Sequence, residues 1–192
     1  VPFCVMLLLA VRVRLRNVPP ATLMLPAEVR VTSVALPLAL ITLLTASTVR
    51  MLIRLLPTTE VLLANGASLV FSIDVGRDQL HPLLRGHPKI VSMEETDIRT
   101  FEGKRLPARP DVVVIDVSFI SLKSVLPVAL SLAAAPMHLL ALIKPQFEAP
   151  RKHSKRGIIR DAMVHREVCD DIAAFAASLG CTDIQVFPSP IA

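Results

Sequence analysis

Several residue types are scarce or missing from this chain of 192 residues. It contains no tryptophan and no tyrosine, and its three cysteines are Cys4, Cys169 and Cys181. These cysteines form no Cys-x-x-Cys pair, and no histidine cluster accompanies them. Because disulfide scaffolds and zinc sites both need closely spaced ligands or paired cysteines, the sequence argues against either class. A reducing compartment is the simpler interpretation.

Glycine, lysine and aspartate are absent from residues 1–58, and all six glycines of the chain lie beyond that point. The same stretch carries six arginines and one glutamate, so its net charge is 6 − 1 = +5, the charge of the whole chain. Residues 59–192 carry 15 basic and 15 acidic residues and are neutral overall. The excess of basic residues is therefore no evidence for a basic groove on the folded part, and the composition divides the chain at about residue 58.

The segment 1–58 has three possible interpretations. Residues 31–49 form an uncharged run long enough to span a bilayer, although four threonines, two serines and Pro37 weaken it as a membrane helix. An irregular region of a soluble protein is the second interpretation. The third, which the composition favours, is a stretch translated out of frame from a GC-rich gene. We therefore expect residues 1–58 to pack poorly and residues 31–49 not to insert stably into a membrane.

Strand-like and helix-like segments alternate from about Thr59 onward. Strand-like runs lie at 69–74, 89–93, 111–117, 138–144 and 183–187, and helix-like segments lie at 78–85, 121–135 and 162–180. The run DVVVIDV is apolar up to its final aspartate, which is typical of a strand buried on both faces. This alternation predicts an α/β fold with a parallel sheet and right-handed crossovers.

Four charged side chains stand at or just after the predicted strand ends, where ligands bind to sheets of this kind. Asp74 closes one strand and is placed to hold a ribose through its hydroxyls, and Asp97 is placed to accept a hydrogen bond from an adenine amino group. Asp116 and Lys144 end two neighbouring strands, and such a pair can orient a hydroxyl and help to remove its proton. The alternative for each residue is a solvated charge at the end of a strand.

The same segments resemble a known family. The resemblance covers residues 59–191 and is carried by FSIDVGRDQL, TDIR, DVVVIDVSFISLKSVLP, LIKPQFE, GIIRD and VFPSPI. These motifs are similar to those of the TlyA family, FtsJ-like ribose 2′-O-methyltransferases of ribosomal RNA that are often labelled hemolysin A. The resemblance implies a Rossmann-like methyltransferase sheet, S-adenosylmethionine as cofactor, and ribosomal RNA or a ribosomal subunit as partner. It implies a cytoplasmic protein without a metal.

The resemblance also implies roles for particular residues. Asp74 corresponds to the acid that binds the cofactor ribose, and Asp97 to the acid on the adenine side. Lys144 corresponds to the central lysine of a Lys-Asp-Lys-Glu catalytic set, and Asp116 to its electrostatic partner. The remaining motif positions are expected to shape the site through packing and loop geometry; they are Phe119, Pro145, Gln146, Phe147 and Glu148.

Residues 1–58 depart from the family pattern. They show no S4-type RNA-binding module, no first catalytic lysine and no glycine-rich loop before Thr59. The last catalytic glutamate of the family is expected beyond the motif at 186–191. We therefore expect a partial methyltransferase domain at 59–192, with the first strand and the glycine loop missing, and a degraded, inactive enzyme. The alternative is a membrane-associated hemolysin-like protein that spans a membrane through residues 31–49.

Overall fold

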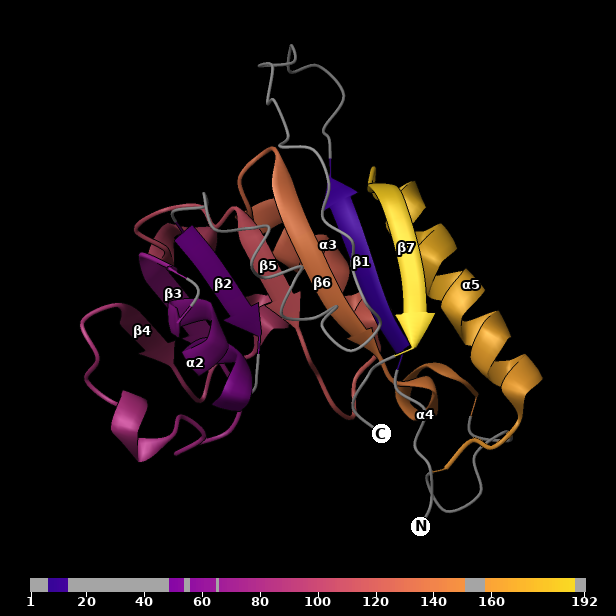
Figure 1. Ribbon diagram of the computed structural model, residues 1–192, viewed down its shortest axis with the longest axis horizontal. Helices are drawn as coiled ribbons and strands as arrows, with labels where there is room; N and C mark the ends of the chain where they lie inside the picture. The colour runs from indigo at the N-terminus through magenta and orange to yellow at the C-terminus, as the bar shows by residue number, and fades with distance from the viewer. Residues whose placement is uncertain (1–6, 14–48, 54–55, 65, 151–157, 189–192) are drawn as a thin grey trace.

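Seven strands of the chain form one sheet, in the order β4-β3-β2-β5-β6-β1-β7 (Figure 1). The computed structural model describes residues 7–13, 49–53, 56–64, 66–150 and 158–188. Five of the strands run parallel to their neighbours in the centre and on one side of the sheet; they are β2 (Val49–Ile53), β3 (Leu69–Ile73), β4 (Ile90–Met93), β5 (Val112–Ile115) and β6 (Met137–Ile143). The predicted α/β fold with a parallel sheet is confirmed.

The other side of the sheet combines the two ends of the chain. The strand β1 (Leu7–Val13) lies between β6 and β7 (Thr182–Pro188) and pairs with both in antiparallel orientation. Residues 7–13 are therefore part of the sheet, although the sequence indicates that residues 1–58 pack poorly.

The structure corrects the expectation that the first strand of the methyltransferase sheet is missing. The strand β2 lies between β3 and β5, with Met51 opposite both Phe71 and Val113. The physical reason is that two parallel strands on either side of a gap present backbone groups that need partners. A short apolar segment without glycine or proline can supply those partners whatever its origin. The glycine loop remains absent, because only Arg54 and Leu55 separate β2 from the helix α2 (Leu56–Ala64).

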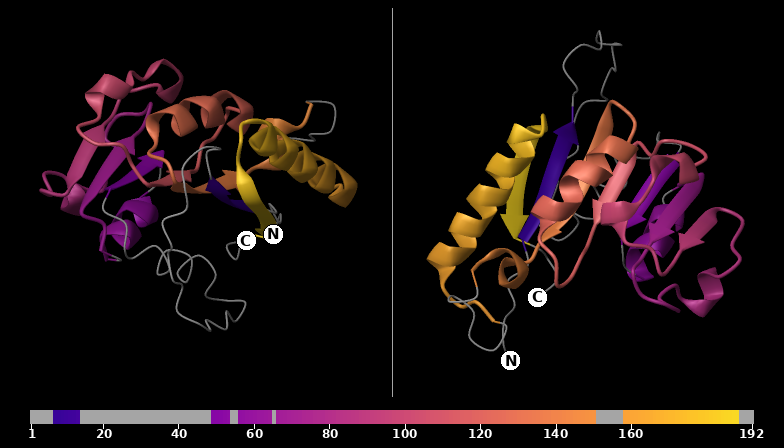
Figure 2. Two further views of the ribbon diagram at one scale, coloured as in Figure 1. Left: turned by 90° about the horizontal axis from the view of Figure 1, so that it is seen from above. Right: turned by 180° about the vertical axis from the view of Figure 1, so that it is seen from behind.

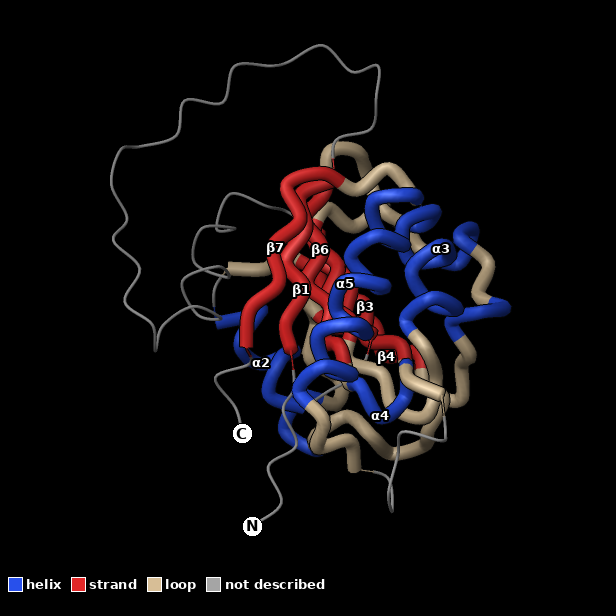
Figure 3. The backbone as a smooth tube through the Cα atoms, turned by 90° about the vertical axis from the view of Figure 1, so that its right-hand side faces the viewer, coloured by secondary structure: helices blue, strands red, loops and turns tan. Residues whose placement is uncertain are grey.

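Helices cover both faces of the sheet. Figure 2 shows α2 on one face, and α3 (Leu122–Leu132) and α5 (Ala162–Ser178) on the other. The central strand β5 serves both layers, because Val113 and Ile115 join the core under α3 and α5 whereas Val112 and Val114 join the core under α2. This alternation explains the uninterrupted valine run in the sequence. Figure 3 shows α3 and α5 side by side against the same face of the sheet.

The predicted helix at 78–85 is wrong. Only a short 3-10 turn, η1 (Pro82–Leu84), forms there. Proline has no backbone N–H and is tolerated only in the first turn of a helix, so Pro82 stands at the start of the turn and cannot lie within a longer helix. The segment before it is therefore a loop, which lies beside the site described below.

Most of the uncharged run at 31–49 lies outside the described residues, so the expectations about that run are not tested. Its last residue, Val49, is the first residue of β2. Among the helices that the structure does describe, none is long and apolar enough to cross a membrane.

Candidate functional site

Lys144 and Asp116 form an ion pair at the carboxyl edge of the sheet. Lys144 follows β6 and Asp116 follows β5, and the parallel pairing of these strands brings the Lys144 Nζ to 2.6 Å from the Asp116 Oδ1. The Lys144 side chain is 11% exposed and that of Asp116 is 18% exposed. The predicted proximity of the two residues is therefore observed.

The ammonium group of Lys144 has a second partner, because it donates a hydrogen bond of 3.0 Å to the Ser118 Oγ. The Asp116 Oδ1 is buried and receives no hydrogen bond from the described part of the chain, so its contact with Lys144 is an ion pair without good hydrogen-bond direction. Sequence reasoning missed Ser118, although its place two residues after Asp116 was a usable signal.

The chain segments that follow Lys144 and Asp116 are joined to each other through Glu148. Lys144 leads directly into the short helix α4 (Pro145–Glu148), and the Glu148 carboxylate reaches across to the start of α3. It accepts a hydrogen bond of 2.5 Å from the Ser121 Oγ and one of 2.8 Å from the Leu122 N–H. This link fixes the start of α3 to α4 and so helps to keep the Lys144 and Asp116 side chains in position relative to each other.

Burial raises the pKa of Glu148 above its ordinary value, against the hydrogen bonds from Leu122 and Ser121, which lower it. Between the ordinary carboxyl pKa and the raised one, the folded state holds a proton that the unfolded state has lost. We therefore expect the free energy of unfolding to fall as the pH rises through this window. Thermal unfolding of wild type and Glu148→Gln over a pH series measures the effect, with the exposed Glu167→Gln on α5 as control. Equal pH slopes in wild type and Glu148→Gln would contradict it.

Phe119, the residue after Ser118, is 89% exposed and has its backbone in the left-handed region, at a φ of 65°. This conformation is uncommon for a bulky residue, and strain of this kind concentrates at functional sites. The Phe119 ring packs against the ring of Phe147 on α4, and the two ring centroids are 5.0 Å apart. An aromatic surface is thus held open to solvent next to a lysine and a carboxylate.

A cavity of about 210 Å³ adjoins this region and contains the two other predicted residues, Asp74 and Asp97. Its walls come from the segments after β3, β4 and β5, and its lining residues are Ile73, Asp74, Val75, Thr96, Asp97, Ile98, Arg99, Val117, Ser118, Phe119 and Ile120. Apolar side chains on these walls can enclose a flat ring, and the carboxylates supply the polar contacts. Because Ser118 lines the cavity and also binds Lys144, the cavity and the ion pair belong to one site.

Asp74 is buried at the end of β3, and its Oδ1 accepts a hydrogen bond of 2.7 Å from the Gly76 N–H. A Cβ atom on Gly76 would lie 2.8 Å from the Gln79 Cγ and 3.1 Å from the Asp74 Oδ1, so a side chain at position 76 would disturb this turn. The turn therefore needs glycine to bring its backbone close to the carboxylate.

Asp97 lies at the other side of the cavity and is engaged by Arg99. The carboxylate accepts hydrogen bonds from the Arg99 guanidinium and from the Arg99 backbone N–H, and these bonds hold the pKa of Asp97 below its ordinary value. Asp97 therefore carries a negative charge at neutral pH and keeps its orientation. Arg99 is a cavity residue that the sequence reasoning did not identify; the motif TDIR contained it.

The cavity suits the adenosine part of S-adenosylmethionine better than its methionine part. Two carboxylates and apolar walls match a ribose and an adenine, whereas the junction of β2 and α2 has no glycine to let the backbone approach the other end. Within the described ranges, no group of three or more histidine, cysteine or acidic side chains is arranged to hold a metal ion.

Comparison with known proteins agrees with this geometry. A family described as FtsJ-like methyltransferase matches residues 58–192, which begins within one residue of the break in composition. The Bacillus subtilis protein YqxC, described as an rRNA methyltransferase, is 40% identical over 134 residues, covering 68% of this chain and 48% of that protein. The 16S/23S rRNA (cytidine-2'-O)-methyltransferase TlyA of Mycobacterium tuberculosis (strain ATCC 25618 / H37Rv) is 37% identical over 134 residues, covering 69% of this chain and 50% of its own length. The chain thus spans about half the length of these curated relatives.

A solved structure shows the same fold. The crystal structure of a Lactococcus lactis protein described as a hemolysin superposes with a TM-score of 0.71 at 36% identity, covering 77% of this chain and 73% of that one. The resemblance seen in the sequence motifs is confirmed by the family match and by these relatives.

Proposed function

Because the chain belongs to the FtsJ-like methyltransferase family, we propose that its site binds S-adenosylmethionine and serves the methylation of a ribose 2′-hydroxyl in ribosomal RNA. The observation that carries the proposal is the Lys144–Asp116 ion pair, which adjoins a cavity with two carboxylates. The relatives named above act on rRNA according to their descriptions, and ribosomal RNA would place this activity in the cytoplasm.

Lys144 and Asp116 have complementary parts in this proposal. The Lys144 ammonium stabilises the negative charge that develops on the 2′-oxygen as the hydroxyl proton leaves. A fixed positive charge at a largely buried position interacts more strongly with that oxygen than a charge surrounded by water would. Asp116 and Ser118 hold the ammonium nitrogen in place, and the Asp116 carboxylate, on a side chain that is 18% exposed, accepts the proton that leaves the hydroxyl. The exposed ring of Phe119 provides a face on which a nucleobase can stack.

Asp74 and Asp97 would hold the nucleoside part of the cofactor, which supplies an electrophilic methyl group when bound. Asp74 binds hydroxyls of the ribose, and Asp97 binds the amino group of the adenine. Both residues line the cavity, whose walls also carry apolar side chains from the segments after three strands. The position of this cavity, at the carboxyl edge of a parallel sheet, supports a nucleotide-like ligand.

The chain in its present form is proposed to bind the cofactor incompletely and to lack transfer activity. Residues 47–58, STVRMLIRLLPT, stand where the family has its glycine-rich loop. Bulky arginine and leucine side chains there prevent the close backbone approach that such a loop provides. An upstream frameshift accounts for a domain whose family sequence begins near Thr59.

Binding measurements test the cofactor half of this proposal. We expect S-adenosylhomocysteine to bind, and adenosine to bind within a few-fold as tightly, because only the nucleoside half finds a formed site. Asp74→Asn should weaken both ligands by about tenfold or more, since the lost charge-assisted hydrogen bonds contribute roughly 1.5–3 kcal/mol. Isothermal titration calorimetry measures these affinities, with the exposed Asp170→Asn on α5 as matched control.

Two results would overturn the cofactor half. The first is the absence of any binding of S-adenosylhomocysteine by the wild-type chain. The second is equal affinity in wild type and Asp74→Asn, which would mean that the ligand does not use the cavity at the end of β3.

A further inference from the structure

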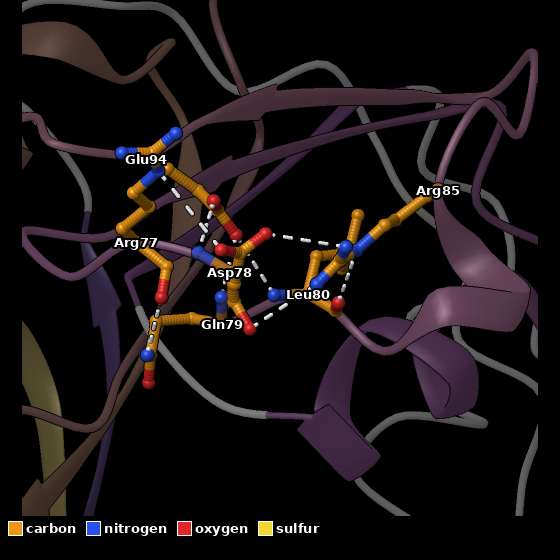
Figure 4. Close-up of polar contacts among 6 residues, drawn as sticks. All are labelled: Arg77, Asp78, Gln79, Leu80, Arg85 and Glu94. Atoms are coloured by element: carbon orange, nitrogen blue, oxygen red, sulfur yellow. Dashed lines mark hydrogen bonds and ion pairs between the residues drawn. The ribbon is translucent and has the colours of Figure 1, made fainter.

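The loop that follows Asp74 is held by a carboxylate to which the family motifs assign no role. Glu94, directly after β4, accepts hydrogen bonds from three successive backbone N–H groups, those of Asp78, Gln79 and Leu80 (Figure 4). The N–O distances are 2.7, 2.7 and 2.9 Å. A carboxylate at the surface can be solvated by water and does not require protein partners. The three charge-assisted bonds therefore act on the loop, and they fix a segment that forms no helix or strand.

Arg85 binds the same segment through its carbonyl oxygens. Its guanidinium donates a hydrogen bond of 3.0 Å to the Leu80 carbonyl and one of 3.3 Å to the Asp78 carbonyl, and it lies 3.2 Å from the Asp78 Oδ1. Figure 4 shows Arg85 and Glu94 on different sides of residues 78–80. The N–H groups of the segment thus face the Glu94 carboxylate, and its carbonyl groups face the Arg85 guanidinium. Together these contacts favour a single orientation of the segment. Asp78 adopts a φ of 57°, an uncommon conformation that these contacts maintain.

The held segment is continuous with the cavity wall. The Gly76 carbonyl accepts a hydrogen bond of 3.0 Å from the Glu95 N–H, and the Asp74 carbonyl accepts one of 2.9 Å from the Thr96 N–H. The loops after β3 and β4 are therefore joined along their length, from the cavity to Glu94. Asp74 and Asp97, the two carboxylates of the cavity, belong to these two loops.

We propose that Glu94 is a positioning residue for the cofactor site, which acts by holding the loop that carries Asp74 and Gly76. The inference rests on the proposed binding of S-adenosylmethionine in the adjoining cavity. Glu94 does not line that cavity, so its effect on a ligand passes through the backbone of residues 74–80. The Glu94 carboxylate is suited to this task because it binds backbone N–H groups. These hydrogen bonds do not depend on which side chains the loop carries.

A double-mutant cycle on the full chain tests the inference, with S-adenosylhomocysteine as the probe in isothermal titration calorimetry. Glu94→Gln removes the negative charge and places a donor beside the three N–H groups, so we expect an affinity loss of about tenfold. In the Asp74→Asn background the same change should lower the affinity less than about threefold. If Glu94 acts by positioning the Asp74 carboxylate, its effect is small once that carboxylate has been removed. Glu95→Gln makes the same charge change at the exposed neighbour and should leave the affinity unchanged.

Hydrogen exchange of the Asp78, Gln79 and Leu80 amides accompanies the titrations and should become faster in Glu94→Gln. The measurements are made well below the unfolding temperature of each variant, so that general loss of the fold does not enter. Equal affinities in wild type and Glu94→Gln, with binding intact, overturn the positioning role alone. Losses that add fully in the double mutant also overturn it, since they indicate a separate structural effect. Absence of binding by the wild type overturns the proposed function and this inference together.

Discussion

We expect Lys144→Ala to lower methyl transfer by about 10³-fold or more in a frame-restored protein, meaning one in which the proposed frameshift upstream of codon 59 is corrected. The physical reason is that Lys144 is the only described cation placed against Asp116, and removal of one member of a catalytic unit costs nearly as much as removal of all. Asp116→Ala should have a loss of similar order. The measurement is incorporation of label from S-adenosylmethionine into ribose 2′-oxygens of ribosomal subunits that lack the modification.

The chain with its own residues 1–58 belongs in the same assay, where it should incorporate no label above the background of its own Lys144→Ala variant. The exposed Lys123→Ala serves as the control for the loss of a lysine near the site. Transfer by the chain with its own residues 1–58 would show that this segment builds a functional cofactor loop. Full activity of Lys144→Ala in the frame-restored protein would contradict the proposed catalytic role of Lys144.

The same ion pair should have a large effect on folding. Both side chains are more than four-fifths buried, so removing one partner leaves an unpaired charge away from water. We expect Asp116→Asn to lower the free energy of unfolding by about 3–5 kcal/mol, which is the usual range for breaking a buried pair. The double variant Asp116→Asn with Lys144→Met should be clearly more stable than Asp116→Asn alone, because no buried charge remains. Chemical denaturation of wild type, of the single variants Asp116→Asn and Lys144→Met, and of the double variant gives the coupling energy.

The chain offers a matched control for this cycle. Lys123 and Asp171 also form an ion pair, at 2.7 Å, but their side chains are 41% and 59% exposed. Water screens such a pair, so its coupling energy should be at most about 1 kcal/mol. If the two cycles give the same coupling, burial does not set the strength of the Lys144–Asp116 pair, and the expected destabilisation is wrong.

The local pattern predicted the strands well because strand formation and burial leave direct traces in the residues. The valine run at 111–117 indicates a strand buried on both faces, and the structure places Val112–Ile115 between two layers of helices. Charges at strand ends have an equally local cause, since water and ligands reach the sheet there. The helix predicted at 78–85 failed for a local reason as well, namely the missing N–H of Pro82.

The positions of β1 and β2 could not be obtained in this way. Nothing in the composition of residues 1–58 distinguishes a strand from any other apolar segment, and Val49–Ile53 becomes the strand between β3 and β5 only because that gap has backbone groups on both sides. In the same way, Leu7–Val13 lies between strands that come more than a hundred residues later. Pairing over such sequence distances is a property of the assembled sheet.

The sequence by itself determined which residues can carry chemistry, because Asp74, Asp97, Asp116 and Lys144 are charged side chains at or just after the ends of apolar strands. Their grouping was decided by the tertiary structure. Parallel pairing of β5 with β6 brings Lys144 and Asp116 to 2.6 Å, and it is loop geometry that supplies Ser118 as a second partner of Lys144. The contacts of Glu94 with three consecutive N–H groups likewise depend on how two loops lie beside each other. Such contacts join residues far apart in the chain, and no periodicity in the sequence records them.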